Sequence, residues 1–268
     1  MNPAPLRPLA EMPRATRLAI RGVLTDIDDT LTTEGRLTAE AYAALQRLQA
    51  AGKLTIPITG RPAGWCDHIA RMWPVDAVVG ENGAFTMRYD RKRRKLDKRF
   101  VDDDATRRAN RARLGEIGDA ILRAVPGAAL ASDQLYREAD LAIDFREDVP
   151  ELSRAAIDRI VALMEAEGMT AKVSSIHVNG WFGSYDKLSM TRRLFSETFD
   201  IDLDAARARF VFVGDSPNDA PLFAYFPNAV GVANVRAFAD RIPTLPAYVT
   251  EREGGAGFAE LADFLLEG

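Results

Sequence analysis

Apolar segments of strand length alternate with helical segments along the first third of the chain, and this alternation constrains the fold more than any other feature. The apolar segments lie at residues 18–27, 53–59 and 75–79. Between them, Thr38 is suited to cap a first helix, and Pro62 is suited to the first turn of a second. Strands and helices that alternate at short spacing are typical of a parallel sheet covered by helices. The sequence therefore predicts an α/β fold.

The pattern changes in the middle of the chain, where strands and helices no longer alternate regularly. Residues 85–89 and 95–100 are predicted to pair as a hairpin, and long helices are expected over residues 104–125 and 150–167. A strand is expected at residues 141–146, with its apolar side chains on one face. This arrangement favours an α+β module over a continuation of the parallel sheet.

The first pattern returns after Lys187. A helix is predicted from there to residue 199, the run at residues 209–213 is strongly β-forming, and a last helix is expected at residues 257–267. The simplest organisation is one α/β domain made from both ends of the chain, with the second module inserted into it. The predicted parts are a flexible proline-rich arm at residues 1–17, a core of residues 18–88 and 186–268, and an inserted domain of residues 89–185.

Composition narrows the classes of function. The 268 residues carry a formal net charge of −4, so the broadly basic surface that nucleic-acid binding needs is not expected. No segment has the roughly 20 apolar residues that span a bilayer, and the first 17 residues lack the apolar region of a secretory signal. A single cysteine, Cys66, cannot form an internal disulfide. We therefore expect a cytoplasmic protein without nucleic-acid or membrane partners, and the oligomeric state is left open.

Three carboxylates follow the first predicted strand, in the sequence DIDDTL at residues 26–31. The carboxyl ends of parallel strands form the edge at which open α/β sheets bind ligands. Asp26, Asp28 and Asp29 repel one another at neutral pH, and a divalent cation relieves such repulsion. The alternative interpretation is an acidic turn in which Asp29 or Thr30 caps the next element.

A second acidic loop, GDSPND at residues 214–219, follows the β-forming run of the C-terminal part. Asp215 and Asp219 would then lie at the same sheet edge as Asp26 and Asp28. Four carboxylates there provide the oxygen ligands that Mg²⁺ prefers, with positions open for water and phosphate. Capping of the following helix would explain Asp215 alone, but it does not explain Asp215 and Asp219 together.

Two further signals are weak when each is taken alone. Thr59 and Gly60 end the second strand just before a helix, where a hydroxyl and backbone N–H groups can bind an anion, and Arg61 follows them. A turn of this kind before a helix is also common without any ligand. Lys187 begins a predicted helix, but most lysines are solvated surface residues.

Taken together and in this order, the four loops resemble the haloacid dehalogenase (HAD) superfamily of phosphohydrolases. Its pattern is Asp-x-Asp-x-Thr after the first strand, Ser or Thr after the second, a distant Lys, and an acidic Gly-Asp-x-x-x-Asp loop. The matching residues are Asp26, Asp28, Thr30, Thr59, Lys187, Asp215 and Asp219. Asp29 departs from the pattern, because many members have glycine there. The resemblance implies a Rossmannoid three-layer α/β/α core with a parallel sheet.

The resemblance also implies roles for these residues. Asp26 is the nucleophile that forms an aspartyl-phosphate, and Asp28 protonates the leaving alcohol and then activates water. Thr59 and Lys187 hold the transferring phosphoryl oxygens. This chemistry depends on positioning and on charge neutralisation more than on complex covalent steps.

For the metal, the resemblance implies a single Mg²⁺ ion. It would lie between Asp26, the carbonyl group of Asp28 and Asp215. Asp219 would support either Lys187 or the water molecules of the metal. Together these four aspartates form the predicted metal site.

The inserted module falls between Thr59 and Lys187, where it resembles a C2-type (C2B) cap of subfamily IIB. This Cof-type group includes sucrose- and trehalose-phosphate phosphatases and phosphomannomutases. The small-molecule substrate is accordingly expected to be a phosphorylated sugar. Asn82 lies in an Asn-Gly-Ala turn before the cap, and Ser175, His177 and Asn179 alternate along a predicted strand. The predicted substrate-binding residues are Thr30, Gly60, Arg61, Asn82, His177 and Asn179.

The leading prediction is a Mg²⁺-dependent phosphatase, that is, a phosphoric monoester hydrolase. A phosphohexomutase of the same fold is an alternative, and a receiver-like signalling module and a non-catalytic sugar-phosphate sensor are two others. The length of the chain argues against the receiver, and the presence of both Asp26 and Asp28 argues against the sensor. The basic run at residues 88–99 is interpreted as a solvated hairpin tip, because acidic residues follow it at once and no aromatic residues are interleaved.

Overall fold

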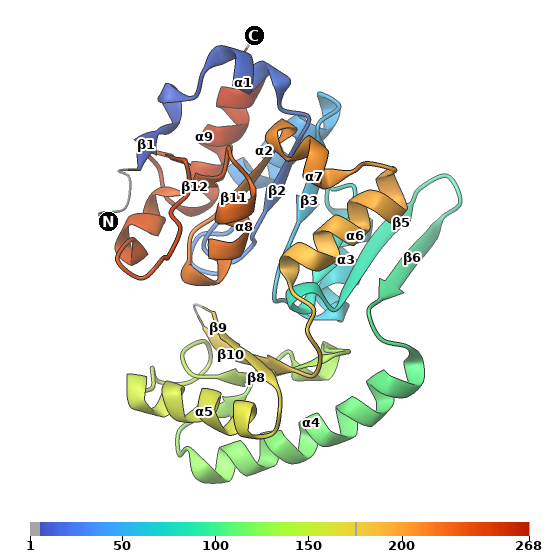
Figure 1. Cartoon of the computed structure of the whole chain (residues 1–268), viewed down its shortest axis with the longest axis vertical. Helices are drawn as coiled ribbons and strands as arrows, with labels where there is room; N and C mark the ends of the chain where they lie inside the picture. The colour runs from blue at the N-terminus through green and yellow to red at the C-terminus, as the bar shows by residue number, and fades with distance from the viewer. Residues whose placement is uncertain (1–5, 175, 268) are drawn as a thin grey trace.

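A parallel sheet built from both ends of the chain lies at the centre of the core in the computed structural model, which describes residues 6–174 and 176–267 (Figure 1). Within this part of the chain the sheet has six strands in the order β1-β13-β12-β11-β2-β3. Their bounds are Arg7–Pro8 for β1, Gly22–Thr25 for β2, Leu54–Pro57 for β3, Phe210–Gly214 for β11, Val230–Gly231 for β12 and Tyr248–Val249 for β13. The α/β class predicted from the sequence is confirmed.

Helices cover both faces of this sheet. Successive side chains of each strand point to opposite sides, and because they are apolar on both sides, both faces must be buried. Val23 and Val211 belong to the hydrophobic core on one face, and Leu24 and Phe212 belong to the core on the other. The first core contains residues of α2 (Ala39–Ala50), α3 (Ala63–Met72) and α9 (Gly254–Leu266). The second contains residues of α6 (Lys187–Phe199), α7 (Leu203–Ala206) and α8 (Ala220–Tyr225). The result is the predicted three-layer core.

The helix termini follow the local chemistry of the sequence. Thr38 caps α2, and its side chain accepts a hydrogen bond from the backbone N–H of Ala41 at 3.2 Å. Asp186 caps α6 in the same way and accepts from the N–H of Ser189 at 2.7 Å. The helix predicted to begin at Lys187 is therefore confirmed.

The prediction of a flexible N-terminal arm is wrong for the described residues 6–17. β1 pairs with β13, and helix α1 (Arg14–Ala19) follows a 3₁₀ turn, η1 (Leu9–Glu11). Leu9 and Met12 are buried in the first core, and the burial of these two apolar side chains stabilises the segment despite its prolines. The strand expected from residue 18 accordingly begins later, at Gly22.

The predicted hairpin forms, and it packs against the core. Strands β4 (Val78–Gly80), β5 (Phe85–Asp90) and β6 (Lys95–Phe100) make an antiparallel sheet, and a bridge between Ile58 and Val79 joins it to β3. Phe85 and Met87 are buried in the first core, whereas the basic tip at residues 91–95 is exposed. The boundary after residue 88 stays a prediction, and these contacts favour placing it after Phe100.

The inserted module has its own sheet and its own hydrophobic core. Its antiparallel sheet has the order β7-β8-β10-β9, and helices α4 (Asp104–Ala124) and α5 (Arg154–Ala166) pack on one face. The strands are β7 (Ala129–Leu130), β8 (Asp140–Asp144), β9 (Thr170–Val173) and β10 (His177–Trp181). The other face of the sheet is turned towards the core, as Figure 1 shows. This module is the α+β cap that the sequence predicts.

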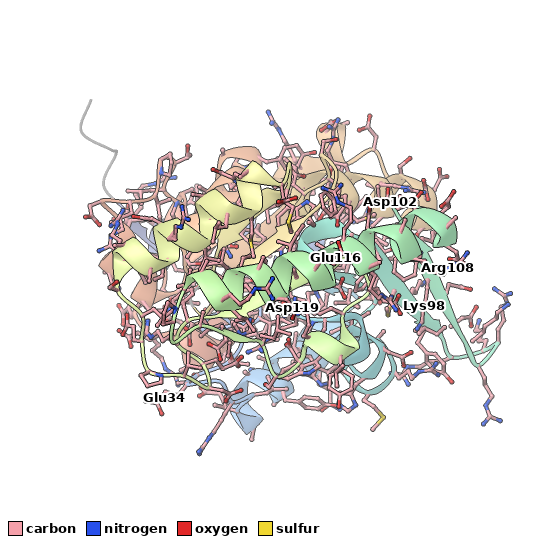
Figure 2. All side chains as sticks on the ribbon, turned by 90° about the horizontal axis from the view of Figure 1, so that it is seen from below. Glu34, Lys98, Asp102, Arg108, Glu116 and Asp119 are labelled. Carbon is pink, nitrogen blue, oxygen red and sulfur yellow. The ribbon has the colours of Figure 1, made fainter. Side chains whose placement is uncertain are left out.

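The outer side of the cap consists of its two helices. Figure 2 looks onto α4 and α5, and it labels Arg108, Glu116 and Asp119 along α4, all three of which are exposed. The 3₁₀ turns not yet described are η2 (Glu81–Gly83), η3 (Gln134–Tyr136), η4 (Arg207–Arg209), η5 (Pro217–Asp219) and η6 (Ala233–Phe238). Among the helices of the described residues, none is both long and apolar enough to cross a membrane.

The η2 turn packs directly against the start of α6. Gly83 has a φ of +105°, and a Cβ atom built on it would lie 2.1 Å from the carbonyl oxygen of Asp186. Only glycine satisfies both constraints, the left-handed backbone and the close approach. This contact brings Asn82 next to Lys187, two residues that are far apart in the sequence.

We expect Gly83→Ala to lower the free energy of unfolding by more than about 2 kcal/mol, because the added methyl group forces these two segments apart. Gly115→Ala is the matched control, since Gly115 lies in α4 with no atom within 4 Å of a built Cβ. It should raise stability by about 0.5–1 kcal/mol through helix propensity. Urea unfolding measures both, and equal effects of the two substitutions would contradict the proposed packing constraint.

Candidate active site

Asp26 and Asp215 follow two neighbouring parallel strands, β2 and β11, at the same edge of the sheet. The backbone N–H of Asp26 donates to the carbonyl oxygen of Val213 at 3.0 Å, which holds the two loops together. One carboxylate oxygen from each of Asp26, Asp215 and Asp219 lies within 4.8 Å of the others, and all three residues are buried. The structure therefore brings these predicted residues together.

The electrostatics of this cluster suit a cation. Burial raises the pKa of Asp26 to about 7, with the charges of Asp219 and Asp28 adding to the effect and that of Lys187 opposing it. Burial, together with the charges of Asp219 and Asp26, also raises the pKa of Asp215 well above its usual range. Buried carboxylates are the hard oxygen ligands that Mg²⁺ prefers, so the donor set fits the predicted metal.

Lys187 lies between two of these carboxylates. Its Nζ donates to Asp26 Oδ1 at 2.9 Å and to Asp219 Oδ1 at 3.3 Å. Burial disfavours the ammonium group, but the two aspartate charges outweigh this and raise the pKa of Lys187. The other oxygen of Asp219, Oδ2, accepts from the backbone N–H groups of Asp215 and Ser216 at 3.1 and 3.3 Å. Asp219 thus supports Lys187 and the loop, one of the two roles considered for it.

Two side chains orient Asp215. The hydroxyl of Thr30 donates to Asp215 Oδ1 at 3.0 Å, and Asn234 Nδ2 donates to Oδ2 at 3.2 Å. Thr30 is fully buried, so the structure favours a positioning role for it over the predicted contact with substrate. Asn234, in η6, was not predicted, because no sequence motif connects it to the acidic loops.

Asp29 has a φ of 55°, in the left-handed region where glycine is favoured. This backbone conformation explains why glycine is common at this position of the motif. Aspartate is one of the few other residues that tolerate it, and the carbonyl oxygen of Asp29 accepts from Asn234 Nδ2 at 2.9 Å.

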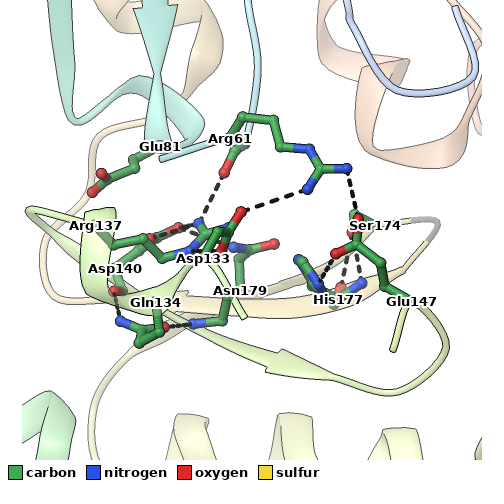
Figure 3. Close-up of polar contacts among 12 residues, drawn as sticks. Arg61, Glu81, Asp133, Gln134, Arg137, Asp140, Glu147, Ser174, His177 and Asn179 are labelled. Carbon is green, nitrogen blue, oxygen red and sulfur yellow. Dashed lines mark hydrogen bonds and ion pairs between the residues drawn. The ribbon is translucent and has the colours of Figure 1, made fainter. Parts of the chain in front are cut away.

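Arg61 connects the core to the cap. Its Nε and Nη2 donate to the Asp28 carboxylate at 2.8–3.1 Å, and Nη2 also donates to Glu147 Oε1 of the cap at 2.9 Å. Nη1 lies 3.5 Å from Asp133 Oδ2, also of the cap, and the Trp65 ring lies against the guanidinium group. Figure 3 shows Arg61 above the cap residues. The predicted anion contact of Arg61 is therefore made here with carboxylates of the protein.

The cap residues predicted to contact substrate lie against carboxylates of the cap itself. His177 Nε2 lies 2.9 Å from Glu147 Oε2, and Asn179 Nδ2 donates to Asp140 Oδ2 at 3.0 Å (Figure 3). Hydrogen bonding by His177, helped by Arg61, outweighs burial and lowers the pKa of Glu147 to about 2. Ser175 lies outside the described residues.

Arg137 makes a second connection between cap and core. Its Nη1 donates to the carbonyl oxygen of Gly60 at 2.9 Å and to Asp140 Oδ1 at 2.9 Å, and its Nη2 lies 3.0 Å from Asp133 Oδ1. The predicted anion loop at Gly60 is thereby tied to the cap. Sequence patterns did not predict that Arg137 and Asp133 contribute to the site. Their spacing of four residues, which is compatible with an ion pair, was the one local signal.

Glu81 strengthens the same connection. Its carboxylate accepts hydrogen bonds from the backbone N–H groups of Ala63 on the core side and of Glu138 and Ala139 on the cap side, at 2.6–3.1 Å. Burial and the nearby Asp140 raise the pKa of Glu81 to about 8, with Arg137 opposing them. Backbone donors from both parts of the protein thus meet at one side chain.

A small cavity of about 20 Å³ remains among Asp26, Asp28, Asn82 and the cap residues His177 and Asn179. This space suffices for about one water molecule. Within the described residues, the buried Nδ2 of Asn82 has no hydrogen-bond partner. Thr59 precedes Gly60 of the cavity wall and is fully buried, and its hydroxyl accepts from the N–H of Arg61 at 3.0 Å. The cap is therefore closed over the acidic cluster.

Comparison with known proteins supports this description. A family model described as haloacid dehalogenase-like hydrolase matches residues 23–112, which contain the first two loops of the site. None of the curated proteins matches the chain significantly.

Several solved structures share the fold. A protein from Thermoplasma acidophilum has a TM-score of 0.69 at 17% identity, covering 92% of this chain and 98% of its own. Sucrose-phosphatase from Synechocystis, solved with sucrose and phosphate, has a TM-score of 0.61 at 17% identity, covering 91% and 98%. The C-terminal domain of trehalose-6-phosphate phosphatase from C. albicans has a TM-score of 0.65 at 12% identity, covering 97% and 98%.

Residues 23–112 therefore match haloacid dehalogenase-like hydrolases, and the chain shares its fold, core and inserted cap together, with these solved structures. The resemblance indicated by the sequence motifs is confirmed, because the family model covers the first two motif loops and the solved structures share both core and cap.

We expect Arg61→Met to lower the free energy of unfolding by about 3 kcal/mol, because it leaves the carboxylates of Asp28, Asp133 and Glu147 without their shared partner. Arg108→Met, on the exposed side of α4, is the matched control and should change stability by less than about 0.5 kcal/mol. Urea unfolding at neutral pH tests the pair of variants. A loss that is no greater for Arg61→Met than for the control would show that this network does not stabilise the closed cap.

Proposed function

We propose that this protein is a Mg²⁺-dependent phosphatase that hydrolyses a sugar phosphate or a similar phosphomonoester through an aspartyl-phosphate at Asp26. The observation that carries the proposal is the position of Lys187, whose ammonium group bridges Asp26 and Asp219 beside Asp215 under a closed cap. A carboxylate that attacks an anionic phosphate needs such neighbouring positive charge. The cytoplasmic location and the absence of nucleic-acid and membrane partners stay predictions.

The proposed reaction has two steps. The Asp26 carboxylate attacks phosphorus, the bond from phosphorus to the leaving oxygen breaks, and Asp28 protonates that oxygen. Asp28 then takes a proton from water as the water oxygen attacks phosphorus, which releases phosphate and restores the Asp26 carboxylate. Mg²⁺, when bound, would supply positive charge that favours the ionised form of Asp26 and offsets the charge of the phosphoryl oxygens. Asp26 and Asp215 would hold it, and the part of Asp28 in the metal site stays a prediction.

The residues around Asp26 contribute positioning. Lys187 would hold a phosphoryl oxygen, and Thr59 and the N–H groups at the start of α3 would bind others. The unpartnered Nδ2 of Asn82 is suited to donate to the substrate. Arg61 orients Asp28 through a bidentate contact.

The cap would exclude water and select the leaving group. Because the closed cavity of about 20 Å³ is too small for a phosphorylated sugar, the cap must move for substrate to bind. His177 and Asn179 would bind hydroxyl groups of the leaving group after releasing their present partners, Glu147 and Asp140.

A panel of sugar phosphates with Mg²⁺, assayed for inorganic phosphate, tests the activity. We expect Asp26→Asn to reduce release to background, because the nucleophile is lost, and Asp28→Asn to reduce it by about 10²–10⁴-fold, because proton transfer is lost. Asp119→Asn on the outer face of the cap should retain wild-type rates. Absence of release from the whole panel, or an Asp26→Asn variant as active as wild type, would refute the proposal. Isomer formation without phosphate release would instead indicate a mutase.

Metal binding has a test that does not depend on turnover. Mg²⁺ added to chelator-treated protein should raise the midpoint of thermal unfolding, because the ion binds the folded carboxylate cluster and not the unfolded chain. Asp215→Asn should abolish this shift, whereas Asp119→Asn should keep it. A shift that survives in Asp215→Asn would place the bound ion elsewhere.

A further inference from the structure

A second cleft opens beside the closed cavity, between the cap sheet and the core. Its volume is about 240 Å³, compared with about 20 Å³ around Asp26. Asn82, Lys187 and Asn218 line both spaces, so the cleft starts at the proposed phosphate site. On the cap side it is lined by Thr170 and Lys172 of β9, among other residues.

The register of the cap sheet places Lys172 on the face that is turned towards the core. In an antiparallel pair, residues directly opposite each other have their side chains on the same face. Asn179 of β10 is opposite Lys172 of β9, and Asn179 lines the closed cavity. Val178, the residue before Asn179 in β10, points to the opposite face of the sheet, into the hydrophobic core under α4 and α5. Lys172 thus stands beside Asn179 on the substrate side of the cap.

The charge of Lys172 is uncompensated in the described structure. The other cations around the site are all paired: Arg61 with Asp28, Arg137 with Asp140, and Lys187 with Asp26. The exposed ammonium group of Lys172, by contrast, has neither a hydrogen bond nor an ion pair with any described residue.

Of the described residues that line this cleft, only Asp186 has a carboxylate side chain. It caps α6, with Oδ1 accepting from the N–H of Ser189 at 2.7 Å. A positive charge without a partner, in a cleft that leads away from the phosphate site, suits an anionic group of the ligand.

We propose that Lys172 binds a second negative charge on the leaving group, so that the preferred substrates are phosphomonoesters whose alcohol part carries a carboxylate or a second phosphate. The inference rests on the proposed phosphatase function and narrows its substrate class. Asn179 and Lys172, side by side on the cap, would then bind a hydroxyl and an anion of the same leaving group.

Matched substrates test the charge preference. Glucose 6-phosphate and 6-phosphogluconate differ by a carboxylate, and fructose 6-phosphate and fructose 1,6-bisphosphate differ by a phosphate. For wild type we expect kcat/KM to be about fivefold to tenfold higher for the anionic member of at least one pair, and the pair that responds identifies the anion. Lys172→Met should remove this preference and leave the neutral substrates within about twofold, whereas Lys172→Arg should keep it.

The control is Lys95→Met, on the exposed tip of the β5–β6 hairpin, which should keep the preference. Raising the ionic strength should weaken the preference of wild type, because the pair is partly solvated. No charge preference in wild type, or one that persists in Lys172→Met, would overturn the inference even if phosphate is released.

Binding measured by calorimetry tests the role of Lys172 independently of the proposed phosphatase activity. Asp26→Asn protein with Mg²⁺ is titrated with each of the four compounds, with and without Lys172→Met. Tighter binding of an anionic member that disappears with Lys172→Met supports the inference, whether or not wild type releases phosphate. Equal binding within both pairs, or binding of none of the four compounds, contradicts it.

Discussion

The contact of Lys187 with Asp26 and Asp219 is the interaction on which the rest of the site depends. These two buried carboxylates come from loops at opposite ends of the chain. Burial, to which the repulsion from Asp219 and Asp28 adds, raises the pKa of Asp26 to about 7. One ammonium group offsets part of this repulsion, and a divalent cation would offset more. The packing of Gly83 against the start of α6 places Lys187 where it can do so.

The closed position of the cap depends on a second set of charges. Arg61 and Arg137 each pair with carboxylates across or beside the boundary between core and cap, and Glu81 accepts N–H groups from both parts. Because Arg61 also holds Asp28, cap closure and the orientation of the proposed acid and base involve the same side chain. Substrate that enters must therefore replace or rearrange contacts that the protein makes with itself.

Sequence patterns predicted the fold well where one local rule decides the outcome. The strand before Asp26 and the helix at Lys187 follow from apolar runs and capping residues. The prediction of a flexible N-terminal arm was wrong, because prolines dominate the local sequence pattern. The burial of Leu9 and Met12 depends on partners that are far away in the sequence. Glu147 could not be predicted, since its contact with His177 depends on the folded cap and its contact with Arg61 exists only when the cap lies against the core.

The sequence by itself determined the α/β core, the inserted cap and the four loops of the proposed active site. Each of these depends on residue types at short spacing, or on the rule that parallel strands end at one edge. The tertiary structure alone decided that Thr30 orients Asp215, that Arg61 joins core and cap, and that Lys172 faces the cleft without a partner. These facts depend on contacts between segments far apart in the chain, which local patterns do not encode.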